Sequence, residues 1–206
     1  MTLHQGKEQV GVPVSPSDMT AAERPDAMRT ASTQQPSTER TDRETRPSGP
    51  ATPLRALGEV PWREIQDSTG SAAAIPLLLN TIAWGGPEAA SGALHELRDR
   101  ICQYGFVVEQ ATAATVPFLW ELAQLPQVTC RARIIQLLKN IADARQWEHT
   151  ASAYPKLLNH RENHVVWERA ARRAVHARRA ALRQLMAEED AEIAHASTEL
   201  ARSLGE

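Results

Sequence analysis

The chain has 206 residues, of which 42% are hydrophobic and only 4% aromatic, and its formal net charge at pH 7 is −2. A charge this small excludes a protein-wide positive field that would draw the chain to nucleic acid or to an anionic membrane. Alanine makes up much of the apolar fraction, which favours helices over strands. No apolar run approaches the roughly 20 residues that span a bilayer, so we expect no membrane partner.

The N-terminal stretch differs from the rest of the chain. Residues 1–52 are rich in Ser, Thr, Pro, Gln and Arg without apolar periodicity, and residues 1–50 hold six Lys and Arg against seven Asp and Glu. Such a segment cannot bury enough surface to offset its ordering entropy. We therefore expect a disordered arm at 1–52, followed by a folded domain at 53–206. It has no basic head or apolar stretch typical of a signal peptide.

The folded part begins with a short helix predicted near Pro61–Asp67, and then one phrase occurs twice. IPLLLNTIAW stands at 75–84 and VPFLWELA at 116–123. We expect Ser71 to cap the first helix and Pro76 and Pro117 each to open a helix. The two prolines are 41 positions apart (117 − 76), within the period of helical HEAT and armadillo arrays.

Each phrase is followed by a second helix with an apolar stripe. Gly85-Gly86 closes the first helix, Pro87 opens the next, and Gly105 ends it. The matching helix of the second unit is predicted from about Val128 to Ala144. The expected buried residues are Ala90, Ala93, Leu94, Leu97, Ile101 and Cys102 in one helix, and Ile134, Ile135, Leu137, Leu138 and Ile141 in the other.

The C-terminal part predicts one long helix over 164–187, a charged corner at 188–190 and a partner helix over 191–204. Residues 145–163 show no clean helix pair. The whole pattern predicts an all-α fold, a short α-solenoid of about three to four antiparallel helical hairpins, each burying its apolar face on its neighbours.

One segment carries a family resemblance. GALHELRDRICQYGFVVEQATAATVPFLWELA (92–123) resembles small HEAT-like repeat proteins of high-GC, actinomycete-type bacteria, which combine an AL-x-EL helix, an aromatic/Gly break and an E-A-T-x-A-V-P-F-L helix. The resemblance extends over roughly 53–204 and departs at 145–163. It implies an α-solenoid and a role in protein interaction, and it brings no catalytic residues. The matching residues are Ala93, Leu94, Glu96, Leu97, Gly105, Glu109, Ala111, Thr112, Ala114, Val116, Pro117, Phe118 and Leu119.

Catalytic and cofactor motifs are missing from the sequence. There is no Gly-rich phosphate loop, no GxSxG elbow and no paired CxxC, so we expect no enzymatic activity and no cofactor. The two cysteines, Cys102 and Cys130, are too few for a disulfide framework and favour structural thiols in a reducing cytoplasm. His160, His164 and Glu168 could share a helix face and hold a metal, but the polar HRENH run favours a solvated corner and no metal site.

The tryptophans outnumber the other aromatic types. Trp84 and Trp120 lie in the repeated phrases and are expected to pack. Trp147 and Trp167 flank the irregular segment 145–163, where they would line a partner-binding groove or act as wedges that hold a loop down.

A stripe of cations is the most prominent charged feature. Over 161–183 there are seven arginines against Glu162 and Glu168, a local charge of +5 (7 − 2). Arginine suits bidentate contact with carboxylate or phosphate. The competing interpretation is a solvated helix face, partly paired with the acidic corner at 188–192. The predicted partner-binding stripe, at i, i+3, i+7, i+10 and i+14, is Arg169, Arg172, His176, Arg179 and Arg183.

Three functions fit this sequence. The first is a non-enzymatic protein-protein interaction or scaffold module, whose helical groove or arginine stripe meets an acidic protein surface. The second is a nucleic-acid-binding protein, by fold analogy with HEAT-like DNA glycosylases, although the negative net charge weighs against it. The third is an immunity protein that blocks a toxin. We favour the first.

Overall fold

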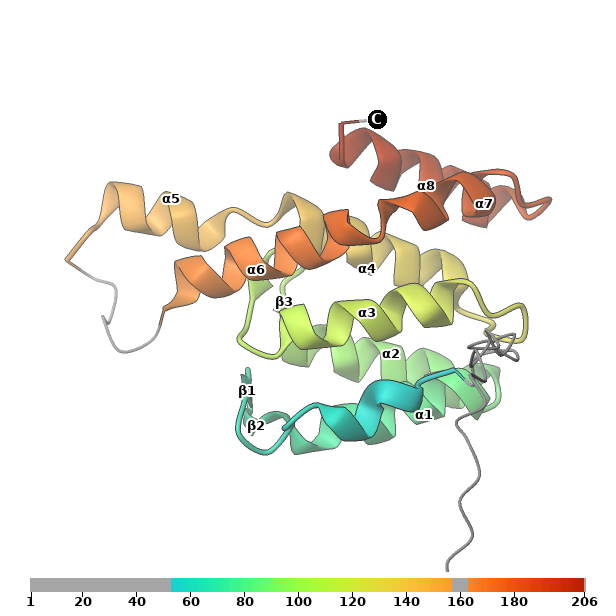
Figure 1. The fold of residues 1–206 in the computed structure, drawn as a ribbon, viewed down its shortest axis with the longest axis horizontal. Coiled ribbons are helices and arrows are strands. Elements are labelled where there is room, and N and C mark those ends of the chain that lie inside the picture. The colour runs from blue at the N-terminus through green and yellow to red at the C-terminus, as the bar shows by residue number, and fades with distance from the viewer. Residues whose placement is uncertain (1–52, 157–162, 206) are drawn as a thin grey trace, which may run out of the picture. The chain divides into compact units, whose positions relative to one another are not determined.

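The computed structural model describes residues 53–156 and 163–205 as a set of packed helices with two very short β-hairpins (Figure 1). The predicted N-terminal arm at 1–52 lies outside the described residues. The all-α expectation is therefore confirmed for the part of the chain that the structure describes.

The first helix pair follows the sequence prediction. α1 (Ile75–Trp84) packs on α2 (Pro87–Ile101), with Pro76 and Pro87 in the first turns of their helices. A Cβ on Gly85 would lie 2.5 Å from the Thr81 carbonyl oxygen, so this turn admits only glycine. Trp84 departs from expectation: it is 59% exposed rather than packed.

The segment before α1 differs from the prediction. In place of a helix at 61–67, the chain forms a 3-10 helix (Arg55–Glu59), the hairpin strands β1 (Gln66–Asp67) and β2 (Gly70–Ser71), and a 3-10 turn (Ala72–Ala74). The Asp67 carboxylate is responsible: it accepts bonds from the Thr69 amide and hydroxyl and pairs with Arg100 at 3.0 Å, which fixes a turn. Ser71 makes no cap bond.

A second hairpin follows α2, which ends at Ile101, earlier than the predicted end at Gly105. Strand β3 (Cys102–Gln103) pairs with β4 (Val107–Val108). The turn residues Tyr104 and Gly105 have φ of 54° and 82°, and the Phe106 amide bonds to the Gln103 carbonyl. Positive φ at both central residues is the mark of a type I′ turn.

The second helix pair corrects the predicted role of Pro117. α3 (Thr112–Ala123) packs on α4 (Arg131–Asp143), and Pro117 lies inside α3 instead of opening it. The Thr112 hydroxyl donates to the Ile101 carbonyl and accepts from the Glu109 amide, which starts the helix five residues before the proline. The two repeated phrases are therefore not structurally equivalent.

The C-terminal part also corrects the sequence prediction. A helix forms within the irregular segment, α5 (Gln146–Ala153), followed by α6 (His164–Ala177). The long helix predicted over 164–187 is broken at Arg178 into α6, a 3-10 turn (Arg179–Ala181) and α7 (Leu182–Met186). The break lets α7 turn onto α8 (Ala191–Ser203), with Leu182 and Leu185 buried.

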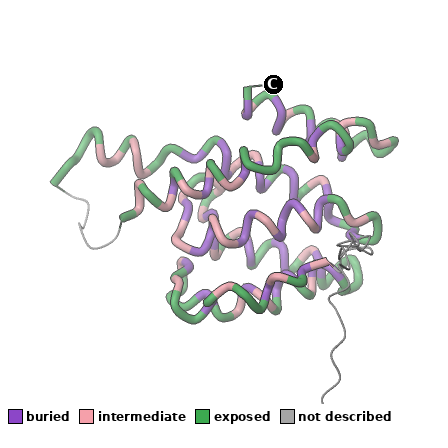
Figure 2. The backbone as a smooth tube through the Cα atoms, viewed as in Figure 1, coloured by how far each residue is buried: buried purple, intermediate pink, exposed green. Residues whose placement is uncertain are grey.

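Two of the later helices, α6 and α8, pack on the second helix pair. α6 lies against α3, α8 lies against α4, and α5 lies beside α6. One hydrophobic cluster runs through these layers, and Figure 2 shows its buried residues recurring along α1 to α4, α6 and α8. The predicted buried stripes of α2 and α4 are confirmed, as is the burial of Trp120. Further buried residues are Leu119, Ile193, Ala196, Leu200 and Leu204.

Candidate interaction site

The predicted arginine stripe is divided by the fold. Arg169 Nε lies 2.7 Å from Glu148 Oε1, and Arg172 Nη2 lies 2.8 Å from Glu148 Oε2. Arg172 also donates to the Ala144 carbonyl, and its side chain is only 14% exposed. These two arginines fasten α5 to α6, so the expectation of one continuous partner-facing stripe is wrong at this end.

Glu168 completes this network from a fully buried position. Its two carboxylate oxygens accept hydrogen bonds from the backbone N–H groups of Trp147 and Glu148 at 2.8 and 3.1 Å. It thus caps the start of α5, where the N-cap residue Arg145 provides no side-chain bond. Among the described residues no group of three metal-ligating side chains occurs, and His160 lies outside them.

The two tryptophans predicted to flank a groove meet around one histidine. The Trp147 ring stacks on the His164 ring at a centroid distance of 4.1 Å, and Trp167 meets the same ring edge-on at 4.6 Å. Trp147 Nε1 donates to the Val108 carbonyl at 2.9 Å. The rings hold α5, α6 and β4 together. This arrangement corresponds to the second interpretation of the two tryptophans, as wedges rather than as the lining of a groove.

The other end of the stripe remains exposed. From position 169 to 187 the sequence has six arginines and no acidic residue. Glu188, expected to neutralise the stripe, instead pairs with Arg131 on α4 at 2.6 Å, and this bond lowers the pKa of its carboxyl. We call the exposed residues Arg173, His176, Arg179 and Arg183 the arginine surface.

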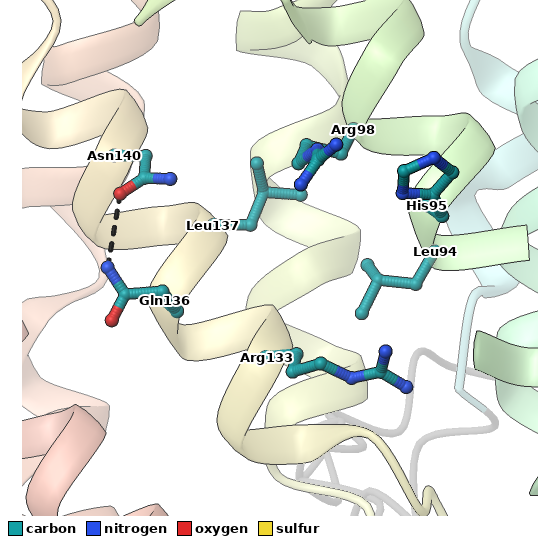
Figure 3. A pocket seen from close by; sticks show the side chains of 7 residues that line it. All are labelled: Leu94, His95, Arg98, Arg133, Gln136, Leu137 and Asn140. Atoms are coloured by element: carbon teal, nitrogen blue, oxygen red, sulfur yellow. Dashed lines mark hydrogen bonds between the residues drawn. The ribbon is translucent and has the colours of Figure 1, made fainter. Parts of the chain in front are cut away.

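A groove between α2 and α4 is a feature that the sequence did not reveal (Figure 3). Its volume is about 200 Å³. The periodicity of each helix shows which of its residues are polar, but only the fold shows that the polar residues of α2 and α4 lie beside each other. Its lining residues are Leu94, His95 and Arg98 from α2 and Arg133, Gln136, Leu137 and Asn140 from α4.

The two thiols fit structural roles. Cys102 is fully buried, and desolvation raises its pKa to about 12. Burial also raises the pKa of Cys130. A nucleophilic thiol needs a lowered pKa, so neither cysteine resembles a reactive one.

Comparison with known proteins finds no match: no protein-family model, no curated protein and no solved structure matches the chain. Within residues 53–156 and 163–205, none of the helices has the length and apolarity needed to cross a bilayer.

Proposed function

We propose that this chain is a non-enzymatic interaction module, a short HEAT-like α-solenoid that binds a protein partner with an acidic surface in the cytoplasm. The packing of α6 on α3 and of α8 on α4 supports the solenoid, since stacked helix pairs bury a continuous core in such arrays. The interruption by α5 and the short α7 would be irregularities of a terminal repeat.

The observation that carries the proposal concerns two arginines of the arginine surface, Arg173 and Arg183. Arg173 and Arg183 are exposed and make no ion pair with any described residue. Neighbouring Arg178 reaches a carboxylate, that of Glu121, only at 3.8 Å. An excess of one charge steers and orients a partner of the opposite charge, and arginine binds carboxylates bidentately.

The test is a pull-down from lysate with the full chain, comparing wild type with the double variant R173E/R183E. The matched control is R55E/R63E, which reverses two other exposed arginines that have no ion pair in the described residues. We expect an acidic protein that is retained by wild type and by the control and lost with R173E/R183E.

Two results would overturn this function. A captured protein retained equally by R173E/R183E would remove the arginine surface from the binding site. Recovery of nucleic acid that nuclease abolishes, with affinity falling steeply as salt rises, would establish the nucleic-acid alternative instead.

A further inference from the structure

The α2–α4 groove combines an apolar lining with an unneutralised cation. Leu94 and Leu137 form its apolar floor and are only 5% and 3% exposed, and no carboxylate of the described residues lines the groove. Arg98 and His95 share a single acidic neighbour, Asp99. Arg133, in contrast, is exposed and makes no ion pair with the described residues. The groove therefore presents positive charge beside an apolar surface, with Arg133 extending from α4 toward the α2 side (Figure 3).

The amides at one end of the groove offer a further donor. Gln136 Nε2 donates to Asn140 Oδ1 at 3.1 Å, the bond drawn in Figure 3. This orientation leaves the Asn140 Nδ2 group available as a donor, since it bonds to no described residue. Arg133 and Asn140 are seven positions apart on α4, about 10 Å along the helix axis. A segment with two carboxylates can therefore place one on the guanidinium and the other on the amide.

The tip of the β3–β4 hairpin adjoins the same end. A Cβ on Gly105 would lie 3.4 Å from Asn140 Nδ2. Beside this glycine, Tyr104 is 81% exposed and Phe106 47% exposed, with ring centroids 6.2 Å apart. The chain has only two tyrosines and two phenylalanines, so one of each stands at this exposed tip.

Tyr104 occupies its position at a conformational cost. Its φ of 54° is in the left-handed region, where asparagine or glycine is preferred at this place in a type I′ turn. The exposed ring makes no contact with the core that would explain why a tyrosine occupies this position. Tyrosine and arginine are, however, the residue types enriched among the strongest contributors to protein interfaces.

We infer that the α2–α4 groove and the Tyr104–Phe106 tip form one docking surface for an acidic peptide segment of a partner protein that carries an apolar side chain. The carboxylates of the segment meet Arg133 and Asn140, and its apolar side chain contacts the aromatic tip. The inference rests on the proposed function in taking a protein partner, but it uses a surface separate from the arginine surface. One unpaired cation is too few for a nucleic-acid backbone, whose binding strength comes from many phosphate contacts.

The probe for this surface is a library of short random peptides, displayed on phage and panned against the immobilised full chain. Selected peptides are synthesised with a fluorescein label, and their dissociation constants are measured by fluorescence anisotropy. The variants are R133E, Y104N and the control R55E, which reverses an exposed arginine that belongs to neither the groove nor the arginine surface. Y104N removes the ring but places a favoured residue in the turn, so the hairpin is retained; circular dichroism checks folding.

We expect selected peptides to combine Asp or Glu with Leu or an aromatic residue, and R133E and Y104N each to weaken binding about tenfold or more, the range of an interface hot spot. R55E should bind like wild type. Peptides without acidic residues, or binding unchanged in R133E or Y104N, would overturn the inference. A labelled oligouridine that binds the wild type but not R133E would also overturn the inference, and it would indicate a single-stranded nucleic-acid ligand instead. Because none of these variants changes the arginine surface, failure of this inference and failure of the proposed function can be distinguished.

Discussion

The Glu168 carboxylate lies 2.8 Å from the backbone nitrogen of Trp147, 21 positions earlier in the chain. The first N–H groups of a helix have no partner within the helix and need an acceptor. α5 has no capping side chain at its own N-cap, so a residue of α6 satisfies its start. This cap, together with Arg172, makes the α5–α6 contact a polar network.

Removing the cap should destabilise the fold strongly. Glu168→Ala leaves two backbone N–H groups of α5 without their acceptor and removes one of the two carboxylates that pair with Arg172. An unsatisfied buried donor typically costs about 1–3 kcal/mol. Glu168→Gln should cost less, because its amide oxygen still accepts one bond. Urea unfolding of both variants measures the difference; equal stability of the alanine variant and wild type would contradict the capping role.

The two ends of the former stripe should respond differently to truncation. Arg172→Ala removes bonds to Glu148 and to the Ala144 carbonyl, and we expect a loss of about 1.5–3 kcal/mol in the free energy of unfolding. Arg183→Ala removes an exposed side chain and should change it by no more than about 0.5 kcal/mol. Denaturant unfolding compares the two, and equal effects would show that Arg172 is not structural.

Acid should weaken the folded state through two glutamates. The hydrogen bond from Arg169 lowers the pKa of Glu148, with a further contribution from Arg172, and the bond from Arg131 lowers the pKa of Glu188. A carboxyl whose folded pKa is below its unfolded value of about 4.3 stabilises the fold above that pH, and this contribution is lost as the pH falls through the folded pKa.

The melting temperature should therefore fall as the pH drops below about 4.3, the unfolded pKa of glutamate. In the double variant Glu148→Gln/Glu188→Gln the fall over that range should be shallower, because two of the responsible groups no longer titrate. Differential scanning calorimetry across this range provides the comparison. Parallel curves for the two proteins would assign the acid sensitivity to other carboxylates.

The cysteines should be unreactive in the folded protein. Cys102 is fully buried with its pKa raised to about 12, and burial also raises the pKa of Cys130. Since the thiolate is the reactive form, Ellman's reagent in mildly alkaline buffer should label neither residue until guanidinium chloride unfolds the chain. Rapid labelling of the native protein at Cys102 would show that α2 ends in a more open structure.

Local signals were sufficient for half of the α-helices that the structure describes. α1, α2, α4 and α8 follow from helical periodicity, and α1 and α2 also from the proline in the first turn of each, because both signals act within a few positions. The start of α3 depends on a bond from Thr112 to Ile101, across the β3–β4 hairpin. With that contact hidden, Pro117 looked like a first-turn residue.

The candidate site was harder to predict, because its charged residues form ion pairs with residues that are far away in the sequence. The sequence predicts Arg169 and Arg172 as members of a partner-binding stripe, because their actual partner Glu148 stands more than twenty positions away in a segment without a clear pattern. The α2–α4 groove likewise depends on which helices become neighbours. In the sequence, its arginines and amides are only ordinary polar positions on two separate helices.

α5 contributes no buried residue to the core and is held mainly by its cap, two arginine bonds and one ring stack. Elements with few buried contacts open locally at a lower free energy than the core, so α5 is the unit expected to detach while α3 and α4 stay folded. Detachment would release Arg169 and Arg172 from Glu148 and extend the arginine surface along α6. An acidic partner would then compete with Glu148 and shift the population toward the detached state, coupling recognition to a local opening of the chain.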